Sequence, residues 1–173
     1  LEDFGGDSLK VLTQQPRLTL VELLPVFVQA ADSLGQLHAA NIIHKDINPA
    51  NLVWNRDTGQ LKIIDLGIST QLPRETPTLT SPNVLEGTLA YLSPEQTGRM
   101  NRSLDYRTDF YSLGVTFYES LTTQLPFPTE DDLELIHCHI AKSPISPAEL
   151  NPAIPRILSD VVMKLMEKNA EDR

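Results

Sequence analysis

Apolar residues recur every three or four positions between residues 20 and 38, among them Leu20, Leu23, Leu24 and Phe27. That spacing places them on one face of an α-helix, so the segment is predicted to be a helix with one buried stripe. Pro25 is expected in or near its first turn, where a missing backbone amide is tolerated. The same periodicity predicts helices at residues 106–121, 130–141 and 156–167.

Two short apolar runs, residues 52–54 and 61–64, flank a turn that contains Asp57 and Gly59. Such a pattern predicts a β-hairpin. Residues 70–85 are rich in Thr and Pro and show neither the apolar period of a helix nor that of a strand. This predicts an exposed loop long enough to be functional. The whole pattern predicts a mainly α-helical fold with a small β-hairpin.

Composition narrows the function classes. The 173 residues are 40% apolar, enough for one domain with its own core. A net charge of −9 argues against nucleic acid and anionic membranes as partners. No apolar run approaches the roughly 18 residues that span a bilayer. A lone Cys138 has no partner for an internal disulfide, which favours a cytoplasmic location.

Candidate chemistry lies around the hairpin. Asp46 and Asn51 are five residues apart in the polar stretch 44–51, and Asp65 follows the second apolar run. Carboxylate and amide oxygens are the ligands that Mg²⁺ prefers, and a further carboxylate can orient a hydroxyl, as phosphoryl transfer requires. Taken alone, an Asp and an Asn at this spacing more often cap turns.

The order of several motifs gives these residues more weight. The stretches 44–51 (HKDINPAN) and 65–67 (DLG) resemble the catalytic loop and the metal-binding triplet of the protein kinase family. Three later stretches resemble further motifs of that family: 87–95, 109–114 and 165–173.

The resemblance covers the whole chain and implies a protein-kinase-like fold in which only the C-terminal lobe is present. It divides the chain into a hinge, a catalytic loop, an activation segment, a central helix and C-terminal helices, at residues 1–6, 44–51, 65–95, 105–121 and 130–173. The chain begins without Met and with a glycine pair nearby, and we interpret it as a fragment.

The resemblance also implies roles for single residues. Asp46 would accept the proton of a substrate hydroxyl, while Asn51 and Asp65 would bind Mg²⁺. Thr88 stands where Ser/Thr kinases usually keep a threonine, which implies a protein Ser or Thr as acceptor. Asn48 stands where Ser/Thr kinases normally place a lysine near the transferred phosphate.

The expected nucleotide is ATP. The hinge backbone, including Glu2 and Phe4, would meet the adenine, with Val53 as part of its floor and Asp7 near the ribose.

Other implied contacts are structural. Arg173 would pair with Glu95. His44 and Leu66 would pack in a spine of side chains anchored by Asp109.

The chain departs from the family pattern in three places. Lys45 replaces the usual arginine. Its ammonium group is a point charge and cannot bind a phosphate group with two parallel hydrogen bonds as a planar guanidinium group does, which argues against control by phosphorylation of the activation segment. Asn48 replaces a lysine, which predicts slower chemistry, because losing one oriented donor can cost roughly 10²–10³ in rate. Leu66 replaces a phenylalanine with little expected effect.

A narrower resemblance, in residues 44–51 and 93–102, is to kinase domains at the start of large bacterial hybrid sensor proteins. It implies further sensor domains and a role in signal transduction. The isolated segment is expected to be inactive, because the glycine-rich loop, the strand lysine and the helix glutamate of the N-terminal lobe are not in it.

Two other functions remain open. A pseudokinase or docking module is favoured by Lys45 and Asn48. A small-molecule kinase shares a similar Asp and Asn arrangement, but the long Thr-rich segment and Ser93-Pro94-Glu95 argue against it.

Three further clusters have ordinary explanations. Residues 137–139 (HCH) are expected on a half-buried helix, where neighbours point in different directions and cannot share a metal. Solvation or local pairing explains Arg99, Arg102 and Arg107 better than phosphate binding does. Loop composition explains Thr76, Thr78, Thr80 and Ser81 at least as well as phosphorylation.

Overall fold

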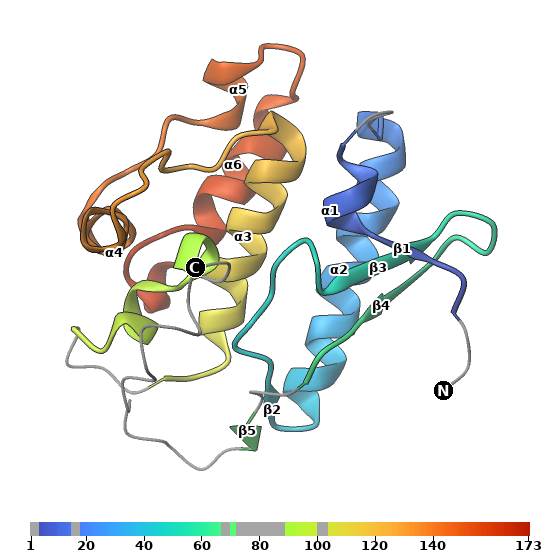
Figure 1. The fold of residues 1–173 in the computed structure, drawn as a ribbon, viewed down its shortest axis with the longest axis horizontal. Coiled ribbons are helices and arrows are strands. Elements are labelled where there is room, and N and C mark those ends of the chain that lie inside the picture. Colours follow the sequence, from blue (N-terminus) through green and yellow to red (C-terminus); the bar gives the residue numbers. More distant parts are fainter. Residues whose placement is uncertain (1–3, 15–17, 67–69, 72–88, 100–103) are drawn as a thin grey trace.

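The computed structural model of the chain describes residues 4–14, 18–66, 70–71, 89–99 and 104–173. It is helix-rich, with small antiparallel sheets (Figure 1). Its elements in chain order are β1 Asp7–Ser8, α1 Leu9–Leu12, α2 Leu20–Ala39, β2 Ile42–Ile43, β3 Leu52–Asn55, β4 Gln60–Ile63, β5 Thr70–Gln71, the 3₁₀ turns η2 Leu89–Tyr91 and η3 Pro94–Thr97, α3 Arg107–Thr122, α4 Asp132–Ala141, α5 Pro147–Leu150, α6 Arg156–Leu165 and η4 Ala170–Asp172.

Helix α2 forms where the apolar period predicts it. Its first turn is closed by a capping box, in which the Thr19 backbone N–H donates to Glu22 Oε2 at 2.7 Å and the Thr19 hydroxyl oxygen accepts from the Glu22 N–H. Pro25 lies in the second turn, deeper than the sequence suggests, on an exposed part of the helix. The opposite face buries Leu23, Phe27 and other apolar residues in the core.

Helix α3 is the centre of the fold. Figure 1 shows it between α2 and α6, and most of its residues are buried. The rings of Phe27 and Phe117 stack with centroids 3.9 Å apart, joining α2 to α3. Among the described residues, no helix is long and apolar enough to cross a membrane.

The predicted hairpin is present as β3 and β4, which pair antiparallel with Leu52 opposite Ile63 and Asn55 opposite Gln60. Strand β1 adds to the other edge of β3, which the sequence did not indicate. A second pair, β2 with β5, places Thr70 and Gln71 in a strand. The prediction of a loop throughout residues 70–85 is therefore wrong at its start, and residues 72–85 lie outside the described part.

Two glycines give a test of this packing. A methyl group at Gly114 on α3 would lie 2.8 Å from Leu165 Cβ and 2.9 Å from Met166 Cγ, whereas one at Gly35 on α2 would meet nothing within 4 Å. We expect Gly114→Ala to lower the free energy of unfolding by about 1–3 kcal/mol. Gly35→Ala should raise it by about 0.5–1 kcal/mol.

Urea unfolding followed by the fluorescence of Trp54, the single tryptophan of the chain, measures both changes. Equal effects of the two substitutions would contradict the close approach of α3 to α6.

Candidate active site

The loop that follows β2 is fixed to the core by one buried carboxylate. Asp109, in the first turn of α3, is fully buried. Its Oδ2 accepts from the His44 backbone N–H at 2.8 Å, and its Oδ1 from the Lys45 N–H at 2.7 Å. His38 Nε2, at 2.8 Å from Oδ2, donates a third bond, since a carboxylate can only accept.

Two side-chain amides hold the Asp46 carboxylate. Asn48 Nδ2 donates to Asp46 Oδ1 at 2.9 Å, and Asn51 Nδ2 donates to Asp46 Oδ2 at 3.0 Å. Asn51 Nδ2 also lies 2.8 Å from the Asp46 backbone oxygen. Asn48 and Asn51 are buried and Asp46 is partly exposed, so two buried amides fix the orientation of the carboxylate.

Asp65 is placed beside this group by the end of β4. The Ile64 N–H donates to the Asn51 backbone oxygen at 2.9 Å, and His44 Nε2 bonds the Ile64 oxygen at 3.0 Å. Asp65 follows with a positive φ of 62° and is exposed. The structure therefore brings Asp46, Asn48 and Asn51 into direct contact, with Asp65 one residue beyond a backbone bond to Asn51.

The donor atoms here fit magnesium. With its nitrogen bonded to Asp46, Asn51 has its Oδ1 left to bind a cation, and Asp65 supplies a carboxylate; both are hard oxygens. Within the described ranges, no group of three His, Cys, Asp or Glu residues could hold a metal ion by itself. Two protein oxygens suit Mg²⁺, which usually keeps water and substrate phosphate among its ligands.

Leu66 differs from expectation. His44 is fully buried, as a spine residue should be, but Leu66 is 47% exposed and Ile64 beside the site is 43% exposed. Both side chains are therefore about half exposed in this chain. The prediction of a packed Leu66 is therefore wrong for this chain by itself.

The segment expected to meet adenine lies against β3. A Cβ on Gly6 would be 2.9 Å from the Trp54 backbone oxygen and 3.0 Å from Val53 Cγ1, so only glycine fits there. Asp7 is exposed and pairs with Trp54 in the sheet. Val53 is half-buried.

Phe4 is held at its carbonyl oxygen, which accepts from Asn55 Nδ2 at 2.7 Å. Glu2 and Thr88 lie outside the described residues.

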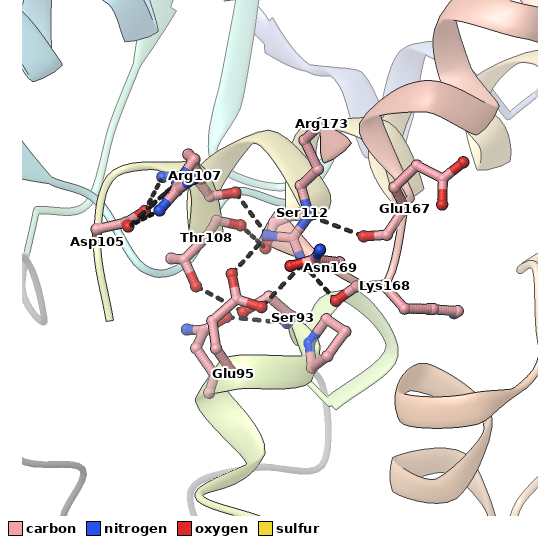
Figure 2. Close-up of polar contacts among 12 residues, drawn as sticks. Ser93, Glu95, Asp105, Arg107, Thr108, Ser112, Glu167, Lys168, Asn169 and Arg173 are labelled. Atoms are coloured by element: carbon pink, nitrogen blue, oxygen red, sulfur yellow. Dashed lines mark hydrogen bonds and ion pairs between the residues drawn. The ribbon is translucent and has the colours of Figure 1, made fainter. Parts of the chain in front are cut away.

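A buried ion pair holds the segment that follows η2 against the C-terminal end of the described chain. Arg173 binds both oxygens of Glu95 with its two terminal nitrogens, both side chains are almost fully buried, and the Arg107 backbone oxygen accepts from Arg173 at 2.8 Å (Figure 2). The predicted pair of Arg173 with Glu95 is thus confirmed. The hydroxyls of Ser93 and Thr108 lie 2.5 Å apart, tying this segment to the first turn of α3.

The clusters with ordinary explanations behave as expected where they are described. Arg107 pairs with Asp105 at 2.7 Å and Arg99 is exposed, while Arg102 lies outside the described part. On α4, Cys138 and His139 are buried but His137 is exposed, so the three do not converge.

Sequence reasoning missed two contacts. Gln96 Nε2 donates to the backbone oxygen of Lys45, and His139 Nδ1 bonds the Tyr111 hydroxyl at 3.0 Å. Neither leaves a signal in the sequence pattern, because both depend on how distant segments pack.

Comparison with known proteins agrees with this geometry. The family model for the protein kinase domain matches residues 1–173, and the chain belongs to the protein kinase family. A probable serine/threonine-protein kinase of Clostridium perfringens is 32% identical over 174 residues, which are 100% of this chain and 25% of that protein. A probable serine/threonine-protein kinase of Streptomyces coelicolor gives the same identity and shares.

The serine/threonine-protein kinase PknB of Mycobacterium tuberculosis is 34% identical over 175 residues, covering 100% of this chain and 27% of that kinase. The chain thus spans about a quarter of the length of these relatives.

The Glu95–Arg173 pair gives a stability prediction. Removing one partner of a buried ion pair leaves the other charge buried alone, so Arg173→Ala should lower the free energy of unfolding by about 3–5 kcal/mol. Arg107→Ala breaks the half-exposed pair with Asp105 and should cost about 0–1 kcal/mol. Urea unfolding of both variants checks this, and a similar loss in each would contradict a special role for the buried pair.

His139 gives a pH prediction. Its burial, together with the Lys168 charge, lowers the pKa of His139 from 6.5 to about 4. Between those values the unfolded chain binds the proton more readily than the folded one, so stability falls as pH drops through this window.

Substituting His139→Asn keeps an acceptor near Tyr111 but removes the titration. From pH 7 to pH 5 the unmodified protein should lose about 2 kcal/mol more unfolding free energy than this variant. Urea midpoints at both pH values measure the difference, and parallel losses would show that His139 titrates normally in the folded state.

Proposed function

We propose that this chain is the C-terminal lobe of an ATP-dependent kinase that phosphorylates protein Ser or Thr hydroxyls. The observation that carries the proposal is the Asp46 carboxylate, held by the amides of Asn48 and Asn51 on a loop that Asp109 fixes to the core. Phosphoryl transfer depends mainly on such positioning, because the protein forms no covalent bond to the moving group.

Asp46 is proposed as the base. Its two oxygens each accept one amide hydrogen bond, and a carboxylate oxygen can accept more than one. A substrate hydroxyl would donate its hydrogen to Asp46, which would orient the hydroxyl oxygen. Asp46 would take the proton as that oxygen bonds to the γ-phosphorus of ATP and the bond from this phosphorus to ADP, the leaving group, breaks. Thr88 and Asn48 are proposed as further residues of this centre, with Thr88 favouring a Ser or Thr acceptor.

Asn51 and Asp65 are proposed as the magnesium ligands. Glu2, Phe4, Asp7 and Val53 are proposed to bind the nucleotide. Bound ATP with Mg²⁺ supplies the phosphoryl group. The residues of this chain would hold that pair beside Asp46.

An N-terminal lobe is proposed to complete the site. Ile64 and Leu66 flank the proposed magnesium ligand Asp65 and expose 43% and 47% of their surface. Two half-exposed apolar side chains beside a reaction centre favour burial by a further segment. That lobe would bring the glycine-rich loop and the lysine that hold the ATP phosphates.

The wider setting is also a proposal. The resemblance to bacterial hybrid sensor proteins supports a cytoplasmic signalling role with additional sensor domains. The competing function, a pseudokinase or docking module, is supported by Lys45 and Asn48, which stand where the family usually has arginine and lysine.

One transfer assay separates the two functions. In the full-length protein, Asp46→Asn should reduce transfer from γ-labelled ATP to protein by at least about 10²-fold, because the proton acceptor is lost. Asp57→Asn, the same change in the exposed β3–β4 turn, should leave transfer unchanged.

Equal labelling by the unmodified protein and Asp46→Asn would favour the non-catalytic module. The isolated 173-residue chain belongs in the same assay and should show no transfer, since the proposed N-terminal lobe is needed for phosphate binding. Robust transfer by it would contradict that part of the proposal.

A further inference from the structure

Gln96 joins the turn η3 to the loop after β2, which carries Asp46. It closes the turn η3, and its Oε1 accepts from the Ser93 N–H at 3.0 Å. Its Nε2 donates to the backbone oxygen of Lys45 at 2.8 Å, across 51 positions in the sequence. The two backbone partners fix the orientation of the amide, because an N–H can only donate and a carbonyl can only accept.

The backbone of Lys45 needs such support. Lys45 has a φ of 69°, in the left-handed region that non-glycine residues rarely adopt, and such a conformation persists only where its surroundings enforce it. Asp109 fixes the peptide plane before its Cα through the Lys45 N–H. Gln96 fixes the plane after it through the Lys45 oxygen.

The second of these planes leads directly to Asp46. The Lys45 carbonyl and the Asp46 N–H belong to one peptide unit, and that N–H donates to His44 Nδ1 at 3.2 Å. Gln96 thus supplies the shorter of these two hydrogen bonds to the unit. Rotation of the plane about the Lys45 Cα–C bond would move the Cα of Asp46. A displacement of about 1 Å in a catalytic group can cost roughly 10²-fold in rate.

We propose that Gln96 is a positioning residue: it holds the Lys45–Asp46 peptide in place and so couples the turn η3 to the orientation of Asp46. The catalytic part of this inference rests on the proposed kinase function. The structural part, that Gln96 restrains the backbone of residues 44–46, does not.

Substitution with glutamate separates this role from simple closure of the turn. Gln96→Glu keeps an acceptor for the Ser93 N–H but replaces the donor to Lys45 by a carboxylate oxygen that repels the carbonyl. Gln96→Ala removes both contacts. Gln60→Glu makes the same chemical change at an exposed position of β4 and serves as the control.

Amide hydrogen exchange of the full-length protein gives the first readout. In Gln96→Glu we expect exchange at Lys45 and Asp46 to become about tenfold faster, while Ser93 keeps its protection; Gln96→Ala should speed all three. Gln60→Glu should match the unmodified protein. Unchanged exchange at Lys45 and Asp46 in Gln96→Glu would overturn the proposal and leave Gln96 as a turn cap.

Kinetics give the second readout. If the full-length protein shows phosphoryl transfer that Asp46→Asn abolishes, Gln96→Glu should lower kcat of that transfer about tenfold. It should change KM for ATP less than twofold, since the proposed nucleotide contacts lie elsewhere. An unchanged kcat would overturn the catalytic part. Absence of any Asp46-dependent transfer in the unmodified protein would refute the kinase function instead, and the exchange result would then decide the structural part alone.

Discussion

The arrangement of the site depends on a carboxylate that never reaches solvent. Asp109 accepts three hydrogen bonds, from the His38 side chain and the backbone of His44 and Lys45. A buried charge without partners would be strongly unfavourable, so the three donors cannot easily leave. Its place in the first turn of α3 adds the favourable end of the helix dipole. The end of α2, the loop after β2 and the start of α3 are thereby fixed together.

The neighbouring residue extends this constraint to the segment that follows η2. Thr108 bonds Ser93, just before Glu95, while Asp109 holds the loop that carries Asp46. Two consecutive residues of α3 therefore anchor both the loop after β2 and the segment that carries Ser93 and Glu95. Gln96 adds a direct bond between those segments. A shift of either segment would displace the other, because close-packed elements transmit strain.

Sequence reasoning recovered the parts of this structure that repeat with a period or match a motif. Helices α2, α3, α4 and α6 and the β3–β4 hairpin follow from apolar spacing, and the Glu95–Arg173 pair followed from the family resemblance. The short helices α1 and α5 were not predicted. Strands β1, β2 and β5 have two residues each, too few for an alternation to be visible. Gln96 was missed because its partner is a backbone oxygen, which any residue at position 45 would present. The exposure of Leu66 depends on what covers it, which its own sequence position does not encode.

Asn48 shows how one departure from the family pattern changes the physics of the loop. Its amide donates to Asp46 Oδ1 and accepts from the Ala50 N–H at 2.9 Å, so it braces the loop from within. A lysine could make the first contact but has no acceptor for the second. The brace stiffens the orientation of Asp46, but it brings no positive charge. In the proposed kinase reaction, charge that develops on the transferred phosphoryl group would therefore be balanced by metal ions or by cationic residues at other positions.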